Sequence, residues 1–167
     1  MSVFFQRCLF LLLLVMLQHS WLDVMWPDFR APGIIIAVVI SLVYLLGFER
    51  GVGWALVATG MSLLIGEVNI FPVYAVGIAY GSGFLTRRLR IEHQTQHVFV
   101  LSLVAATAAL MFVLILNVLQ VATVPFVNAL GNAGITAVLF PLVFGSIRWR
   151  ESQIERSLML EFRSVRT

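Results

Sequence analysis

The chain consists largely of long apolar stretches separated by short polar or charged segments. An open sheet would leave unpaired backbone groups in lipid, and the alternation of apolar and polar residues that membrane barrel strands need is absent. The pattern therefore predicts an all-α membrane protein, a bundle of six transmembrane helices. The six apolar stretches are residues 3–22, 33–48, 51–66, 70–85, 98–119 and 126–147.

These stretches fall into two classes by length. Stretches 3–22, 98–119 and 126–147 are long enough to cross a bilayer unaided. The middle three hold 16 residues each, slightly fewer than the roughly 17 that a span needs. We expect them to run nearly upright, to recruit flanking residues or to thin the bilayer locally.

Charged residues are few and clustered. Residues 33–147 include only seven, and six of these stand in the pair Glu49 and Arg50 and in the segment 87–92. The two clusters are predicted to mark turns, and Glu67 stands alone. Hydrophobic residues make up 60% of the chain and charged residues 11%, against about 25% charged in a soluble domain. The predicted organisation is a transmembrane bundle at 1–147 and a basic cytoplasmic tail at 148–167.

The distribution of arginines predicts the orientation. All eleven basic residues are arginines, and with six spans and a cytoplasmic N-terminus only Arg30 falls outside. The positive-inside rule therefore predicts that both termini lie in the cytoplasm. The first stretch resembles a signal peptide but lacks a small-residue cleavage pattern, so we expect it to be retained as an anchor. The cytoplasmic set is Arg7, Arg50, Arg87, Arg88, Arg90, Arg148, Arg150, Arg156, Arg163 and Arg166.

The segment after Ile147 is too polar to span a membrane. Apolar residues such as Ile154, Leu158 and Phe162 recur in it every three or four positions, with arginines between them. One interpretation is an amphipathic helix on the membrane surface, held by apolar burial and by anionic lipid headgroups. The other is a solvated continuation of the last helix that only enforces topology. Either structure would offer a cytoplasmic face to a partner.

Glu67 is the one isolated charge among the apolar stretches, at the outer end of the third. A charge at the bilayer centre costs at least about 2.5 to 3.5 kcal/mol on insertion scales, and less near the interface. We favour a structural role, accepting hydrogen bonds where two short helices turn. The alternative, a proton or cation ligand, needs a partner from the first external loop, where Asp23, Asp28 and Arg30 are the candidates.

Small and amide residues follow one face of the last stretch. Asn128, Asn132 and Thr136 are spaced by four, with alanines beside them at the same spacing. Helices in lipid associate through small residues and interhelical hydrogen bonds, so this face is expected to contact protein. Gly77 and Gly81 form a second close-packing motif, suited either to internal packing or to a dimer.

No catalytic or metal-binding motif stands out. The chain has no HExxH, no paired acids at helical spacing, no phosphate loop and no cysteine cluster. His93 and His97 are four residues apart but lack a third ligand, and we expect them to be solvated loop residues. The sequence does not support an enzyme, and no cofactor, metal or nucleic-acid partner is expected.

Several motifs are distributed over nearly the whole chain: the segment Trp26-Pro27-Asp28-Phe29-Arg30-Ala31-Pro32, Gly66-Glu67, Arg87-Arg88-Leu89-Arg90, Asn128-Ala129-Leu130, Pro141 and the basic tail. In these motifs the chain resembles the MreD family of bacterial rod-shape-determining membrane proteins, although Glu67 stands where the family more often has Asp. The resemblance implies a location in the bacterial cytoplasmic membrane.

The resemblance implies a non-enzymatic scaffold of the lateral-wall elongation complex that helps to regulate cell shape. It also implies an MreC-like bitopic scaffold protein as partner, together with an actin-like filament and wall synthases. The family fold is expected to be similar to that of the substrate-binding subunits of small vitamin importers.

The alternative function is a vitamin-type substrate-binding transport subunit, in which polar groups line an external pocket. Convergence of these groups on an open cavity would favour transport, whereas packing against neighbouring helices would favour a scaffold. An intramembrane enzyme would need two catalytic groups within hydrogen-bond reach, and no pair qualifies. The pocket candidates are Glu67, Asn117, Asn128 and Asn132.

Overall fold

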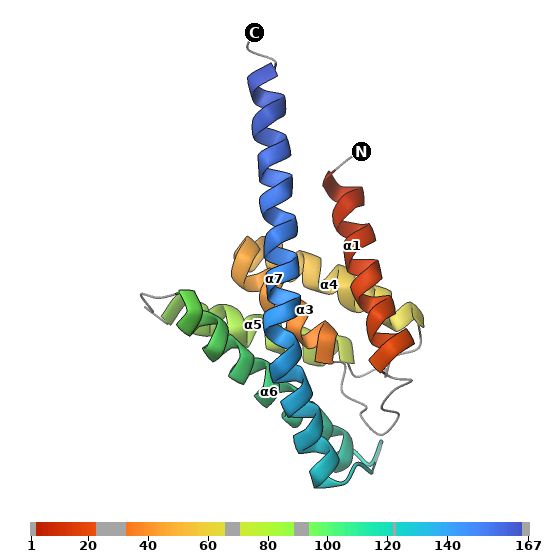
Figure 1. The fold of residues 1–167 in the computed structure, drawn as a ribbon. Helices are drawn as coiled ribbons and strands as arrows, with labels where there is room; N and C mark the ends of the chain where they lie inside the picture. Colours follow the sequence, from red (N-terminus) through yellow and green to blue (C-terminus); the bar gives the residue numbers. More distant parts are fainter. Residues whose placement is uncertain (1–2, 23–32, 66–70, 89–93, 122, 165–167) are drawn as a thin grey trace.

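A computed structural model of the chain describes residues 3–22, 33–65, 71–88, 94–121 and 123–164. These residues contain helices and no strand (Figure 1), which confirms the predicted all-α class. The α-helices are α1 (Val3–Leu17), α3 (Gly33–Leu46), α4 (Phe48–Ile65), α5 (Phe71–Arg88), α6 (Gln94–Val118) and α7 (Phe126–Ser164), and a π-helix η1 (Gln18–Leu22) extends α1.

Each predicted apolar stretch contains an α-helix, but the turn after the second lies earlier than expected. The chain breaks at Gly47, which has a φ of 79°, a left-handed conformation that glycine adopts without steric cost. The amide of Gly51 donates to the carbonyl of Gly47 at 2.8 Å. Glu49 and Arg50 therefore lie in the first turn of α4 and not in the connection. An acid such as Glu49 is favourable at a helix N-terminus because of the helix dipole.

Three of the helices in the described part of the chain are long and apolar enough to cross a membrane. The qualifying segments are Val3–Ser20, Gln96–Val118 and Phe126–Ile154. Gly33–Leu46 and Val73–Leu85 are apolar but shorter, and at about 1.5 Å per residue they fall short of a hydrocarbon core of about 30 Å. The structure supports a membrane protein, and the prediction of six spans is not confirmed.

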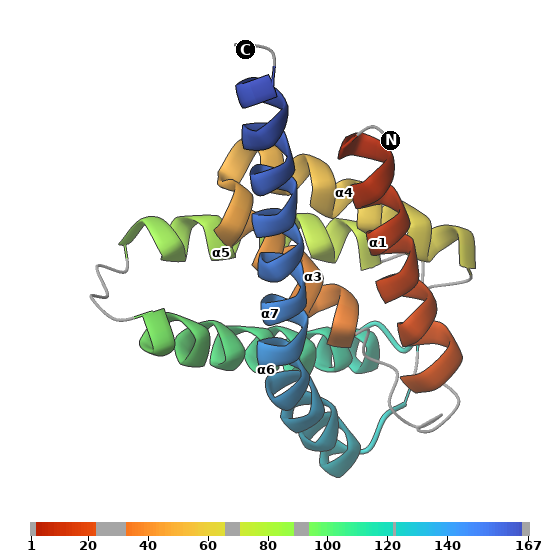
Figure 2. The same cartoon turned by 45° about the horizontal axis from the view of Figure 1, so that its top comes forward.

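Helix α3 forms the centre of the molecule. Every residue from Gly33 to Val43 is buried, because α4, α5, α6 and α7 all contact this helix. Helices α1 and α7 run in opposite directions, so that the two chain ends lie at the same end of the molecule (Figure 1). Helices α4 and α5 run across the direction of α7, as Figures 1 and 2 both show, and α6 packs along its first half. An upright orientation was one of three alternatives for the short middle stretches, and α4 and α5 do not run parallel to α7.

Helix α7 is a single helix of 39 residues. It passes from the predicted last span into the basic tail without a break at residue 147, and its final turns extend beyond the other helices (Figure 1). The tail is thus a direct continuation of the last apolar helix up to Ser164.

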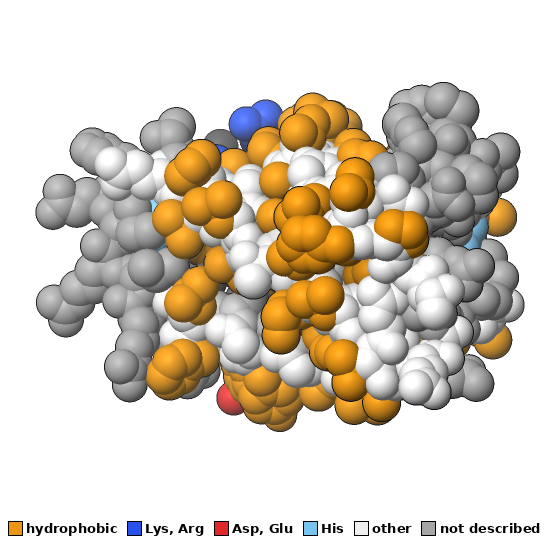
Figure 3. Space-filling view, turned by 90° about the horizontal axis from the view of Figure 1, so that it is seen from below, with side chains coloured by type: hydrophobic (Ala, Val, Ile, Leu, Met, Phe, Trp, Pro, Cys, Tyr) orange, Lys and Arg blue, Asp and Glu red, His pale blue; other side chains and the backbone are white. Residues whose placement is uncertain are grey.

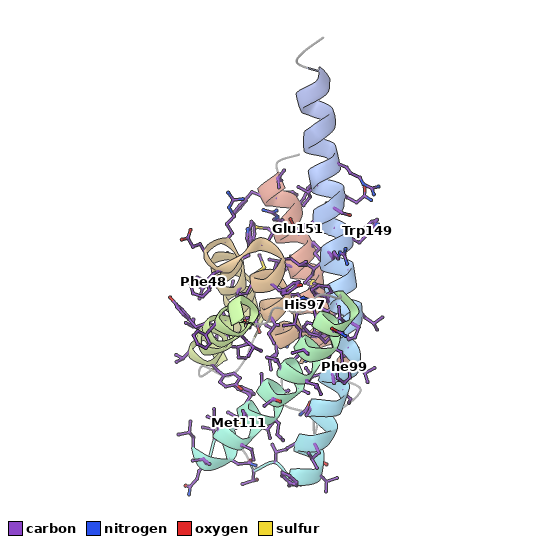
Figure 4. The ribbon with its side chains drawn as sticks, turned by 90° about the vertical axis from the view of Figure 1, so that its left-hand side faces the viewer. Phe48, His97, Phe99, Met111, Trp149 and Glu151 are labelled. Atoms are coloured by element: carbon purple, nitrogen blue, oxygen red, sulfur yellow. The ribbon has the colours of Figure 1, made fainter. Side chains whose placement is uncertain are left out.

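The exterior carries many large apolar side chains. Phe99, Met111 and Trp149 project from the outer faces of α6 and α7 (Figure 4) and are 65%, 48% and 62% exposed. From below, the described surface is largely apolar, with charged side chains only at its margins (Figure 3). Apolar exposure on this scale is unusual for a soluble monomer and fits a protein whose surroundings are lipid.

Candidate functional site

The predicted polar face of α7 is packed against the start of α3. Asn132 is 3% and Thr136 1% exposed, whereas Asn128 is only partly buried. The Thr136 hydroxyl donates to the carbonyl of Asn132 at 2.8 Å. A Cβ atom added to Gly33 would lie 2.6 Å from Thr136 Oγ1, so the backbone of α3 touches this face directly. The Nδ2 atom of Asn132 is buried and has no hydrogen-bond partner among the described residues.

Gln18 completes this contact from a third element, η1. Its side chain is 1% exposed, and its Oε1 accepts a hydrogen bond from the amide of Ile34 at 2.9 Å. The first amides of a helix have no partner within the helix, and Gln18 satisfies one of them for α3. Gln18 is not among the residues predicted from the sequence, although an amide inside an apolar stretch is the signal that identifies it.

Asn117, a pocket candidate, lies in the last turn of α6, next to the connection to α7. Its Nδ2 donates to the carbonyl of Val124 at 2.9 Å, and its Oδ1 accepts from the amide of Val124 at 2.7 Å. Both ends of the amide are therefore used to hold the chain where it reverses direction. These two hydrogen bonds give the Asn117 side chain a structural role at the end of α6.

Gly77 and Gly81 lie on the exposed side of α5. A Cβ atom added to either glycine would meet nothing within 4 Å, so the described part of the chain does not use the motif for internal packing. The glycines share the outer face of α5 with large exposed side chains. We refer to Val73, Gly77, Tyr80, Gly81 and Phe84 as the α5 outer face.

Helices α4 and α5 meet along an apolar seam that leaves no space for a water molecule. Small residues dominate this seam, among them Ala55 and Thr59 of α4 and Ala75 and Ala79 of α5. Small residues allow close approach of helix backbones in lipid. The α4–α5 side thus combines a closely packed seam with an open glycine face.

The strongest polar contact in the described structure joins α1 to α7. Arg7 binds Glu151 through two parallel hydrogen bonds, from Nε to Oε1 at 2.9 Å and from Nη2 to Oε2. The guanidinium of Arg7 lies 5.6 Å from the centre of the Trp54 ring on α4, within the range of cation–π attraction. Next to this pair, Arg150 donates to Gln6 Oε1 at 3.0 Å. Both arginines were predicted only as topology signals, and no sequence pattern connects Arg7 with Glu151, which lies 144 residues away.

The remaining predicted residues fall into three groups. Asp28, Glu67 and Arg90 lie outside the described residues, and Arg87 and Arg88 end α5 with side chains that are likewise not described. Arg148 and Arg156 are exposed on α7.

The prediction that His97 is a solvated loop residue is wrong. His97 lies in α6, is partly buried, and has its ring 5.5 Å from that of Tyr44. The polar loop therefore ends before this residue, and His97 takes part in the packing of α6 against α3. His93 lies outside the described residues.

The hydrogen bonds of Gln18, Asn117 and Arg7 hold helices and turns in position. Comparison of the chain with protein-family models, with curated proteins and with solved structures finds no match.

Proposed function

We propose that this chain is a non-enzymatic scaffold of the bacterial cytoplasmic membrane that acts in the regulation of cell shape, as its resemblance to the MreD family implies. One observation supports a scaffold over a transport subunit: two of the four polar side chains suited to a ligand pocket are used in contacts within the chain. Asn117 holds the connection between α6 and α7, and Asn132 is buried where α7 meets α3.

The proposed topology has six membrane-embedded helices and both termini in the cytoplasm. Three observations support it: three helices have the length and apolarity to cross a bilayer, both chain ends lie at the same end of the molecule, and Arg7 pairs with Glu151 at that end. Arginines at one end of the molecule agree with the positive-inside rule. The shorter α3, α4 and α5 would be held in the membrane by their packing against α1, α6 and α7.

The proposed partner is a bitopic scaffold of the MreC type, with an actin-like filament and wall synthases as further components. Within the chain, the α7 face of Asn132 and Thr136 is already covered by α3. The α5 outer face has open space at both glycines, so it has room for the membrane helix of a partner. The exposed Arg148 and Arg156 leave the α7 tail suited to a cytoplasmic contact.

Depletion in a rod-shaped bacterial host tests this function. Depleted cells are expected to become round, and the intact protein is expected to copurify with a bitopic membrane protein from native membranes. A Gly77→Leu, Gly81→Leu double variant should lose that partner, whereas Gly53→Leu, at another exposed and open glycine, should retain it.

Unchanged cell width together with failure to recover such a partner would overturn the proposal. A small molecule that stays bound through purification would instead favour the vitamin-type transport subunit. Fusion of a reporter to Thr167 tests the topology separately, since activity only outside the membrane would exclude a cytoplasmic C-terminus.

A further inference from the structure

The outward-facing side of α7 changes its chemistry along the helix axis. Val138 and Leu142 are exposed apolar side chains, Trp149 is an exposed aromatic one, and Arg156 is an exposed cation. Leu142, Trp149 and Arg156 are spaced by seven residues, or about two helical turns, so they lie on one side of the helix. Arg148 is exposed next to Trp149. We refer to these five residues as the α7 outer face.

The length of α7 relates this face to the layers of a bilayer. A hydrocarbon core of about 30 Å takes about 20 helical residues, so α7, which begins at Phe126, leaves the core close to Gly145. The headgroup region adds about 5–7 Å on each side, and the next turn of the helix, with Arg148 and Trp149, crosses it. Arg156 lies about 12 Å further along the axis than Arg148. Arg148 and Trp149 therefore lie among headgroups, whereas Arg156 extends beyond them.

The charge of Arg148 is not neutralised within the described part of the chain. Glu151, the nearest acid along α7 with a described side chain, points away from Trp149 (Figure 4) and binds Arg7 of α1. No carboxylate among the described side chains contacts Arg148 or Arg156. A guanidinium forms strong charge-assisted hydrogen bonds with phosphate oxygens. The α7 outer face is therefore open to an anion from outside the chain.

The two other membrane-capable helices lack this combination. In α1 the basic residue is Arg7, which is bound to Glu151. Helix α6 carries large exposed apolar side chains such as Phe99, but it contains no arginine or lysine between Gln94 and Val118. Among the described helices long enough to cross a membrane, α7 alone joins exposed apolar side chains to an arginine without a carboxylate partner.

A phospholipid has its chemical groups in the same order as this face. Its acyl chains lie in the hydrocarbon layer beside Val138 and Leu142, and its phosphate lies at the depth of Arg148. Tryptophan is enriched at the membrane–water interface, and anionic lipids of the cytoplasmic leaflet attract basic side chains near the surface. An acidic cytoplasmic protein would complement Arg156 but would leave the apolar part of the face unmatched.

We propose that the α7 outer face binds an anionic phospholipid of the cytoplasmic leaflet, with the phosphodiester on Arg148 and an acyl chain along Leu142 and Val138. Trp149 packs beside the lipid where the headgroup joins the chains. The lipid lies against the outside of the helix, and Arg156 stays accessible to a cytoplasmic partner. This inference rests on the membrane placement in the proposed function and is independent of the role in cell shape.

Fluorescence of Trp149 in the reconstituted full-length protein tests the site. The chain has four tryptophans, so the Trp149 signal is taken as the difference between the parent protein and Trp149→Phe. Bromine atoms on an acyl chain quench a tryptophan that they contact. At equal mole fractions in phosphatidylcholine vesicles, brominated phosphatidylglycerol should quench Trp149 more strongly than brominated phosphatidylcholine, because phosphatidylglycerol carries a net negative charge.

Two arginine variants separate a specific contact from a general charge effect. Arg148→Gln should lower the relative affinity for phosphatidylglycerol about fivefold, the effect of one arginine close to an anionic membrane surface. Arg156→Gln is the matched control, since it removes the same charge from the same face. The Debye length of about 8 Å weakens its interaction with the headgroups, so the loss should stay below about twofold. Arg148→Lys keeps the charge and should retain most of the preference.

Equal quenching of Trp149 by the two lipids in the parent protein would overturn the proposal and would leave the arginines to an acidic cytoplasmic protein. Equal losses in Arg148→Gln and Arg156→Gln would show a general charge effect and would also overturn it. Inorganic phosphate, compared with chloride at equal ionic strength, should not abolish the preference. Loss of the preference in phosphate would assign Arg148 to a free anion. These measurements use reconstituted protein, so a failure here is distinct from unchanged cell width on depletion.

Discussion

Helices α3 and α5 are both short and apolar, but they meet different surroundings. All of α3 from Gly33 to Val43 is buried, whereas α5 buries one side and exposes the other. On α5, Ala75 and Ala79 face the protein, and Val73 and Phe84 are 77% and 60% exposed. Lipid solvates an exposed apolar side chain nearly as well as protein does. What separates a central helix from a peripheral one is therefore shape complementarity and not hydrophobicity.

Truncation of a central side chain should have the largest effect. Ile36 on α3 is 0% exposed, and Ile36→Ala is expected to lower the free energy of unfolding by about 2–5 kcal/mol because it leaves a cavity that α3 cannot fill from any side. Val73→Ala on α5 should change it by less than about 0.5 kcal/mol. Thermal or denaturant unfolding of the two purified variants measures the difference, and equal losses would contradict the contrast between the two helices.

A close approach between backbones should have the next largest effect. A Cβ atom added to Gly51 would lie 2.4 Å from Val43 Cα, and a backbone cannot yield as a side chain can. Gly51→Ala is expected to destabilise the protein by about 1–3 kcal/mol. Gly77→Ala meets nothing within 4 Å and should stabilise α5 by about 0.5–1 kcal/mol through helix propensity. The two substitutions are expected to change the free energy of unfolding in opposite directions. A loss of stability in Gly77→Ala would show that a neighbour covers the α5 outer face.

One hydrogen bond connects the inner side of α5 to α6. The Tyr74 hydroxyl donates to the carbonyl of Ala108 at 2.5 Å, so Tyr74→Phe should cost about 0.5–1.5 kcal/mol by leaving that carbonyl without its donor. Tyr80→Phe removes a hydroxyl from a side chain that is 56% exposed, and the expected change is within about 0.5 kcal/mol. Chemical denaturation of both variants measures the two losses of unfolding free energy. A larger loss in Tyr80→Phe than in Tyr74→Phe would contradict the assignment of the inner and outer faces of α5.

The smallest effect is expected where a glycine meets the edge of a ring. A Cβ atom at Gly83 would lie 2.5 Å from Phe48 Cδ2, but this is a side-chain atom, which can shift more readily than the backbone atoms that a Cβ at Gly51 would meet. The gain in helix propensity offsets part of this adjustment, so Gly83→Ala should change stability by about 0.5 kcal/mol or less. A loss as large as that of Gly51→Ala would mean that Phe48 is held as rigidly as the α3 backbone.

The apolar stretches predicted the helices well because apolarity is the property that a bilayer selects. The second stretch was expected at 33–48, and α3 is found at Gly33–Leu46. The break at Gly47 was missed, since a glycine in an apolar run signals either a turn or a close contact and its φ angle decides between them. The stretch 126–147 predicted the start of α7 but not its end, because polarity ends a span without ending a helix.

The spatial arrangement could not be predicted in the same way. Helix α3 is apolar on all sides, and a helix surrounded by lipid has the same pattern. The sequence pattern therefore does not reveal that α3 is central. The orientation of α4 and α5 across α7 depends on contacts such as that between Gly51 and Val43, which sequence spacing does not reveal. The pairing of Arg7 with Glu151 joins residues from the two ends of the chain.

This pairing also constrains the order in which the protein can be completed. The two partners are 144 residues apart, and at about 5–20 residues per second the ribosome needs on the order of ten seconds or more to produce the second after the first. During that time the Arg7 guanidinium has no Glu151 to bind, and its charge is met by water or by lipid phosphates. The contact between α1 and α7 can form only after Glu151 has left the ribosome, so its closure is a late step in folding.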